Sequence, residues 1–307
     1  MRRFTIGVDL GGTNLRAAAF NEQGILLDQT SFETDLSQGP EAVVDDIVAA
    51  ISEMRDNHRD HSLLGVGVGV PGFIRLKEGL IVGSNNLVTL EGFPIRDAIS
   101  RKLGTPVMLE NDANAAALGE CWLGAGKDVE DLVLLTLGTG VGGGIISHGR
   151  VIHGTLGMAG ELGHMTIHPE GNPCGCGNRG CLEKHASATA IAAMAELIQL
   201  GRDLTAADVH KMAVAGDRRA HQVFASVGQA LGIALASLIN IFNFPLYLLS
   251  GGPLPAWDFF APAMMHEIET RSYCYRHSKT RVEKAVLGNL AGLYGAAYLP
   301  YQQSVEQ

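Results

Sequence analysis

Two glycine-threonine turns, each placed between short apolar runs, constrain the fold of this chain more than any other feature. The first turn spans residues 9–13 (DLGGT) and the second spans residues 137–140 (LGTG). Glycine lets backbone N–H groups approach an anion, because a side chain at these positions would block it. One such turn could be an ordinary hairpin turn, but two in matching contexts indicate two related lobes that face one cleft and bind a nucleoside triphosphate.

The apolar pattern predicts an α/β chain. Residues 4–8, 15–20 and 25–32 predict an antiparallel meander of strands, followed by a helix over residues 40–54. Further strands are expected over residues 63–70, 106–109, 132–137, 143–147 and 246–249. Further helices are expected over residues 94–103, 111–122, 186–200, 218–240, 256–271 and 289–299. No linker is rich in proline or serine, so we expect a smaller lobe over residues 1–119 and a larger one over residues 120–287.

Composition excludes several classes of protein. The 307 residues include 32 Asp and Glu against 23 Lys and Arg, for a net charge of −9, and no stripe of basic residues offsets it. This charge disfavours nucleic acid as a partner and favours small molecules. The long uncharged stretch at residues 222–257 contains Asn240, Asn243 and Pro245. It therefore predicts a buried helix followed by a buried strand, and no membrane association.

Three of the five cysteines crowd into eight residues near a histidine. The spacing H-x9-C-x-C-x4-C supplies one imidazole and three thiolates, which is the donor set of a closed, structural zinc site: His164, Cys174, Cys176 and Cys181. His168 is an alternative to His164 as the fourth ligand. Such a loop is typical of a reducing compartment, and Asp9 interrupts the first apolar run too early for a signal peptide. We therefore expect a cytoplasmic protein.

Asn111 and Asp112 stand between an expected strand and an Ala-rich helix. Asp112 could simply cap the helix. Alternatively, its carboxylate could accept the proton of a sugar hydroxyl that attacks a γ-phosphate, with Asn111 orienting the sugar. Glu161 and Glu183 flank the cysteine loop and would bind hydroxyl groups. Because these candidate residues include no Lys or Arg, the acceptor is predicted to be a neutral hexose.

Two matches to G-x-G-x-x-G, at residues 138–143 and 67–72, are weak signals. A dinucleotide-binding fingerprint is followed by a helix, whereas residues 143–147 predict a strand. The chain also lacks a P-loop, because Gly126 and Lys127 are followed by Asp128. Neither dinucleotide binding nor a P-loop fold is therefore expected.

Taken together, five motifs resemble the ROK (repressor, open reading frame, kinase) family of sugar kinases, and within it the bacterial ATP-dependent glucokinases. The likeness covers nearly the whole chain and rests on residues 9–13, 110–115 (ENDANA), 137–142 (LGTGVG), 159–164 (AGELGH) and 174–183 (CGCGNRGCLE). It implies an actin-like, RNase-H-like fold of two lobes with a structural zinc loop. It also implies magnesium-ATP as phosphoryl donor, transfer to the 6-hydroxyl of a hexose such as glucose, a homodimer, and a terminal helix, residues 288–300, that packs back on the first lobe.

The resemblance further implies a role for each matching residue. Asp112 would be the catalytic base. The sugar hydroxyls would be held by Gly72, Asn85, Asn111, Asp112, Glu161, His164 and Glu183, with His164 using its second ring nitrogen. Asp9 would act near magnesium, and the rest of the nucleotide would be bound by Gly11, Gly12, Thr13, Gly138, Thr139, Gly140, Gly251 and Gly252.

The chain departs from the family pattern in two turns. The turn at residues 250–253 (SGGP) has two glycines where the family usually has three, and the turn at residues 154–157 (GTLG) is unusual near the sugar. Repressors of the family carry an N-terminal DNA-binding extension, and we expect none here because the first phosphate turn begins at residue 9. The alternatives are a kinase for fructose, allose, mannose or N-acetylmannosamine, a sensor of sugar and nucleotide without catalysis, or polyphosphate as the donor.

Overall fold

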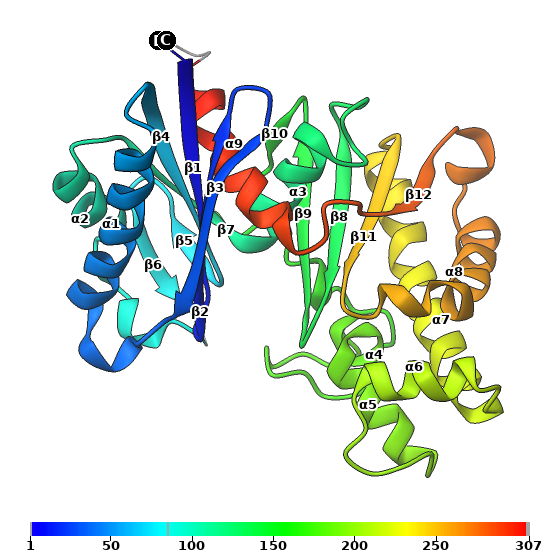
Figure 1. The fold of residues 1–307 in the computed structure, drawn as a ribbon. Helices are drawn as coiled ribbons and strands as arrows, with labels where there is room; N and C mark the ends of the chain where they lie inside the picture. Colours follow the sequence, from blue (N-terminus) through cyan, green and yellow to red (C-terminus); the bar gives the residue numbers. More distant parts are fainter. Residues whose placement is uncertain (1, 85, 305–307) are drawn as a thin grey trace. The chain divides into compact units, whose positions relative to one another are not determined.

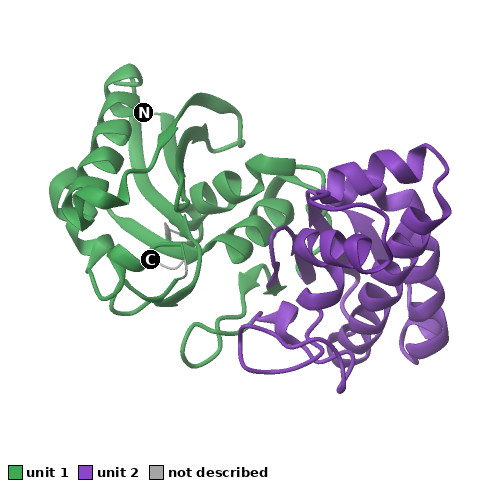
Figure 2. Ribbon diagram, turned by 90° about the horizontal axis from the view of Figure 1, so that it is seen from below, with its two compact units in different colours: residues 1–130, 145–159, 286–307 green, residues 131–144, 160–285 purple. Residues whose placement is uncertain are grey.

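The computed structural model describes residues 2–84 and 86–304 and divides the chain into two compact units (Figure 2). Unit 1 contains residues 1–130, 145–159 and 286–307, and unit 2 contains residues 131–144 and 160–285. The chain passes from unit 2 to unit 1 within one strand, after Gly144. Asn85, which the family pattern assigns to the sugar, lies outside the described residues.

The sheet of unit 1 has the strand order β3-β2-β1-β4-β7. Its strands are β1 (Arg2–Leu10), β2 (Asn14–Asn21), β3 (Leu26–Glu33), β4 (His61–Val70) and β7 (Val107–Asn111). The first three strands are antiparallel neighbours, which confirms the predicted meander, whereas β4 and β7 run parallel to β1. Because parallel strands end at the same edge of a sheet, the last residues of β1, β4 and β7 lie at one edge.

Alternation along β1 separates the two faces of this sheet. Phe4, Ile6 and Val8 pack into the core with α1 (Pro40–Asn57) and α2 (Ile95–Leu103). The opposite face carries α9 (Ala291–Ser304), as Figure 1 shows.

Glycines bring α9 into backbone contact with that face. A Cβ on Gly7 would lie 2.1 Å from the carbonyl oxygen of Leu293, and one on Gly67 would lie 1.9 Å from that of Ala296. Gly67, the first glycine of the motif at residues 67–72, therefore serves to pack α9. This agrees with the expectation that the motif is weak evidence for phosphate binding.

The helix α3 (Asp112–Leu123) packs against α9 in the same manner. A Cβ on Gly295 would lie 1.6 Å from the carbonyl oxygen of Ala115. Trp122 stacks on Tyr298 with the ring centroids 4.9 Å apart. Unit 1 also contains the small sheet of β5 (Phe73–Arg75) and β6 (Leu80–Gly83), and the short strand β10 (Arg150–Val151), which the sequence pattern did not predict.

The second sheet has the order β10-β9-β8-β11-β12. In addition to β10 it contains β8 (Leu132–Leu137), β9 (Val141–Ser147), β11 (Leu246–Gly251) and β12 (Arg281–Lys284). The helices of unit 2 are α4 (Glu183–Ala186), α5 (Ala188–Leu197), α6 (Ala206–Val214), α7 (Arg218–Phe242) and α8 (Trp257–Arg271). The helix predicted over residues 186–200 is present as α5 but is shorter at both ends, because Ser187 is extended and its side chain caps the start of α5.

Helix α7 and strand β11 are largely buried, which confirms the prediction for the long uncharged stretch. Within the described part of the chain, α7 is the one helix long and apolar enough to cross a membrane, and 61% of its most apolar window is buried in the protein. Core helices of soluble proteins have the same properties. This helix is therefore weak evidence for a membrane span.

Candidate active site and metal centre

The first glycine turn closes the hairpin between β1 and β2. Gly11 donates its N–H to the carbonyl oxygen of Asn14 at 2.8 Å, and a Cβ on Gly12 would lie 2.7 Å from the carbonyl oxygen of Asn86. A hollow of about 430 Å³ lies at this turn and is lined by Asp9, Gly11, Thr13, Asn14, Arg16 and Ser31. The structure thus places three of the predicted nucleotide residues around one space.

Arg16 is a residue of this hollow that the sequence reasoning missed. It forms an ion pair with Asp9, and its other guanidinium nitrogen donates to the carbonyl oxygen of Asn289 at 2.8 Å. The hairpin register pairs Asp9 directly with Arg16 across the two strands. The pairing could have been found from the sequence, because the position of the turn fixes the register of the hairpin and so places Arg16 opposite Asp9.

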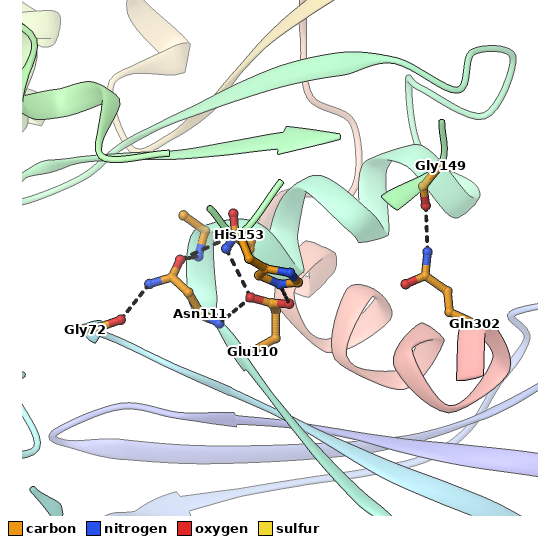
Figure 3. A network of polar contacts seen from close by, with 8 residues as sticks. Gly72, Glu110, Asn111, Gly149, His153 and Gln302 are labelled. Atoms are coloured by element: carbon orange, nitrogen blue, oxygen red, sulfur yellow. Dashed lines mark hydrogen bonds and ion pairs between the residues drawn. The ribbon is translucent and has the colours of Figure 1, made fainter. Parts of the chain in front are cut away.

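Asn111 and Asp112 form the corner between β7 and α3. Figure 3 shows Asn111 at this corner. Asn111 is the N-cap of α3, since its Oδ1 accepts the N–H groups of Ala113 at 2.9 Å and Asn114 at 3.2 Å. Its Nδ2 donates to the carbonyl oxygen of Gly72 at 3.2 Å. The N-cap position is therefore taken by Asn111 and not by Asp112, which is the first residue inside the helix; Asp112 Oδ1 still accepts the N–H of Ala113 at 2.8 Å.

The second glycine turn lies at the start of α5. Gly138 accepts the N–H of Ala188 at 2.8 Å, and the carbonyl oxygen of Thr139 accepts the hydroxyl of Thr189 at 2.8 Å. The turn after β11 adjoins it, since Gly252 donates its N–H to the carbonyl oxygen of Leu137 at 3.0 Å.

Gly251 has a φ of +109°, and a Cβ on it would lie 1.9 Å from the carbonyl oxygen of Leu137. The predicted residues Gly138, Thr139, Gly140, Gly251 and Gly252 are thus gathered at one end of the unit 2 sheet.

The four predicted zinc ligands come together in unit 2. One ligand atom from each of His164, Cys174, Cys176 and Cys181 lies within 4.8 Å of the other three. The Sγ atoms of Cys176 and Cys181 are 3.7 Å apart, and Cys174 Sγ is 3.6 Å from His164 Nδ1. A tetrahedral zinc with bonds of about 2.3 Å to sulfur and 2.0 Å to nitrogen requires separations of this size. The cluster therefore could hold a zinc ion.

The thiols would have to release protons to bind a divalent cation. Burial, followed by the effect of the neighbouring thiols, raises the pKa of Cys181 to about 12. A hydrogen bond from the Asn178 backbone lowers the pKa of Cys176. A metal ion binds such a cluster by displacing its protons. His168 is not part of the cluster; its ring lies 5.3 Å from that of His185.

Two carboxylates extend from the metal cluster. His164 directs Nδ1 toward Cys174 and has Nε2 3.9 Å from Glu161 Oε2. The pKa of Glu161 is raised, mainly by burial. The nearby His164 lowers this pKa, and Glu183 raises it. Glu183 Oε2 accepts the N–H of Val141 at 3.2 Å. Glu183 thus links the metal loop to the second glycine turn. His164 directs one ring nitrogen toward the cysteines and the other toward Glu161.

Comparisons with known proteins decide the family. The model of the ROK family matches residues 5–303. The chain belongs to the ROK family. It is 38% identical to a glucokinase of Halalkalibacterium halodurans over 98% of this chain and 96% of that protein. It is 32% identical to an N-acetylmannosamine kinase of Escherichia fergusonii over 96% of this chain and 97% of that protein.

Solved ROK structures have the same fold. A ROK hexokinase from Thermus thermophilus matches with a TM-score of 0.87 and 34% identity, over 99% of this chain and all of that one. A ROK glucokinase from Streptomyces griseus, solved with glucose and AMPPNP, matches with a TM-score of 0.74 and 32% identity over 97% of this chain and 99% of that one. The actin-like sugar kinase fold expected from the sequence is therefore confirmed.

Proposed function

We propose that this ROK sugar kinase transfers the γ-phosphate of ATP to the 6-hydroxyl of a neutral hexose, with glucose as the preferred acceptor. The observation that carries the proposal is the corner at Asn111 and Asp112. Asn111 takes the capping role and binds the Gly72 carbonyl, so Asp112 enters the first turn of α3. A helix N-terminus favours the ionised form of a carboxylate, and a general base must be ionised to accept a proton.

In the proposed reaction, Asp112 accepts the proton of the 6-hydroxyl while that oxygen bonds to the γ-phosphorus and ADP leaves. Asn111, together with Glu161, His164 and Glu183, would bind the other hydroxyls. Asp9 would act near magnesium, and the two glycine turns near the phosphates. Zinc would have a structural role, because its four protein ligands would close the coordination shell and leave no position for substrate. It would hold the loop that carries Glu161 and Glu183.

The acceptor is proposed to be uncharged because of the chemistry of the sugar residues. The proposed set offers amides, carboxylates and one imidazole but no basic side chain of its own. Lys184 Nζ lies 3.7 Å from Glu183 Oε1, so its charge is paired with that carboxylate. A sugar acid or sugar phosphate would lack a cationic partner in such a set.

The test is a coupled assay of ADP release with magnesium-ATP across glucose, mannose, fructose, allose, glucosamine and N-acetylated hexosamines. Asp112→Asn should lower kcat by about 10²–10⁴-fold and change the sugar KM little, because base catalysis contributes this much. Asp46→Asn, at an exposed position of α1, is the matched control and should have wild-type kinetics. If Asp112→Asn retained most of its turnover, Asp112 would not be the base.

A second candidate is a kinase of N-acetylmannosamine, which the relative from Escherichia fergusonii favours. In the same assay, turnover of that sugar in preference to glucose would retain the mechanism and change the substrate. We also infer a reducing, cytoplasmic location, because three thiols within 4.8 Å of one another would otherwise oxidise. A homodimer remains a proposal, for which light scattering of the purified protein is the test.

A further inference from the structure

A buried carboxylate lies directly behind the proposed base. Glu110 is the penultimate residue of β7, and 3% of its side chain is exposed. One of its oxygens, Oε1, accepts the N–H of Asn111 at 2.9 Å and the side-chain amide of Asn114 at 3.0 Å. Glu110 therefore holds both the residue before Asp112 and a residue in the first turn of α3.

The second oxygen of Glu110 contacts a residue from a distant segment. Glu110 Oε2 lies 2.6 Å from Nε2 of His153, which follows β10 (Figure 3). The side chain of His153 is 34% exposed. A buried carboxylate requires hydrogen bonds or an opposite charge, and His153 supplies one or both through a ring nitrogen that carries a proton.

The segment that carries His153 packs at the same corner. The carbonyl oxygen of His153 accepts the N–H of Ala159 at 3.1 Å, which closes the turn at residues 154–158. Gly157 in that turn adopts a φ of +76°, and a Cβ there would lie 2.4 Å from the carbonyl oxygen of Ile74. Ile74 follows Gly72 by two residues, so the segments of Gly72, Asp112 and His153 converge within unit 1.

We propose that His153 is a positioning residue for the phosphoryl transfer, which acts through Glu110 on the Asn111 and Asp112 corner. Without an N–H donor at residue 153, Glu110 would lose its partner on Oε2 and turn toward water. This change would weaken its hold on Asn111 and on the first turn of α3. The inference rests on the proposed function, since it concerns the placement of the proposed base.

Two substitutions of similar size separate donation from packing. His153→Gln keeps a side-chain N–H donor, whereas His153→Met fills a similar volume without one. His153→Met should lower kcat about 10–100-fold, because displacing a catalytic group by a fraction of an ångström has effects of this order. The hexose KM should rise by a smaller factor than kcat falls, because the network loosens Asn111 while Glu161, His164 and Glu183 lie outside it. His153→Gln should recover most of the lost kcat.

A readout that needs no activity accompanies the kinetics. The amide hydrogen of Asn114 bonds to Asn111 Oδ1, whereas that of Ala113 is shared between Asn111 Oδ1 and Asp112 Oδ1. The Asn114 amide should therefore exchange with solvent at least about tenfold faster in His153→Met than in the wild type. His266→Ala, at an exposed position of α8, is the control and should change neither exchange nor kcat.

Wild-type kcat and unchanged exchange in His153→Met would overturn the inference. Equal losses of kcat in the Met and Gln variants would also overturn it, because the donor would then be irrelevant. If the wild-type protein phosphorylates no hexose, the proposed function fails, and the exchange rates still decide whether His153 holds the corner.

Discussion

Two glycines of α9 provide a matched test of how closely this helix packs. A Cβ added to Gly295 would lie 1.6 Å from the carbonyl oxygen of Ala115, and real contacts of this kind stay beyond 3.0 Å, so α3 and α9 would have to separate by about 1.4 Å. A Cβ added to Gly292 would meet no atom within 4 Å. Neither glycine has a positive φ, so alanine fits the backbone at both positions.

The expected free energies of unfolding follow from these contacts. Alanine in place of glycine in a helix stabilises it by up to about 1 kcal/mol, and this gain is common to both variants. Overpacking against a backbone carbonyl costs about 3 kcal/mol, the upper end for an inserted methyl group. Gly292→Ala should therefore stabilise the protein by up to about 1 kcal/mol, and Gly295→Ala should destabilise it by about 2 kcal/mol.

Urea unfolding followed by fluorescence measures both values. Trp122 stacks on Tyr298 of α9 and reports on unit 1, and the second tryptophan, Trp257, can be removed by Trp257→Phe in all variants. The two alanine variants should differ by about 3 kcal/mol in free energy of unfolding and by several degrees in Tm. Equal stability of the two variants would refute the inference that α3 and α9 are in backbone contact.

Three further predictions concern unit 2. Cys176→Ser should lower the zinc content measured by atomic absorption and reduce Tm, because one of the four proposed zinc ligands is lost. Full metal content would contradict the zinc assignment. In the capping box of α6, a hydrogen bond from the Thr205 hydroxyl is the main cause that lowers the pKa of Asp208 to about 2. The stability that ionised Asp208 contributes is therefore present above its ordinary pKa of 3.8 and is lost as the pH falls toward 2. Thr205→Ala should move that pKa back toward 3.8 in a carboxyl NMR titration, and an unchanged value would contradict the cap. Gly140→Ala would place a Cβ 2.3 Å from Glu183 Oε2, at the end of a flexible side chain, so the hexose KM should rise with little change in Tm; an unchanged KM would remove Glu183 from the sugar site.

The parts of the fold that could be predicted are those with strong periodicity. Strand β8 was expected over residues 132–137 and spans Leu132–Leu137, and the helix expected over residues 40–54 appears as Pro40–Asn57. Shorter elements such as β5 and β12 contain only three or four residues, which is too few for a period to be visible. Helix α6 did have a local signal, the capping box of Thr205 and Asp208, which was missed.

The site was predictable where its chemistry is local in sequence. The spacing of the cysteines predicted the metal cluster, because the ligands lie on one short loop. Neither the sequence spacing nor the composition identified His153, which lies 43 positions from Glu110 and meets it only through the tertiary fold. Arg16 lies outside the glycine motif at residues 9–13 and meets Asp9 only through the register of the hairpin, so the motif alone does not identify it.

The discontinuous path of unit 1 has a consequence for how the protein is made. The strands of its sheet emerge early from the ribosome, whereas α9, which covers one face of that sheet, emerges after all of unit 2. Until then the glycine-lined face at Gly7 and Gly67 remains open to solvent and to other nascent chains. Unit 2 can thus complete its core during synthesis, while unit 1 completes its core only afterwards. An increase in chaperone dependence is therefore expected from any change that slows the docking of α9, even one that leaves the active site intact.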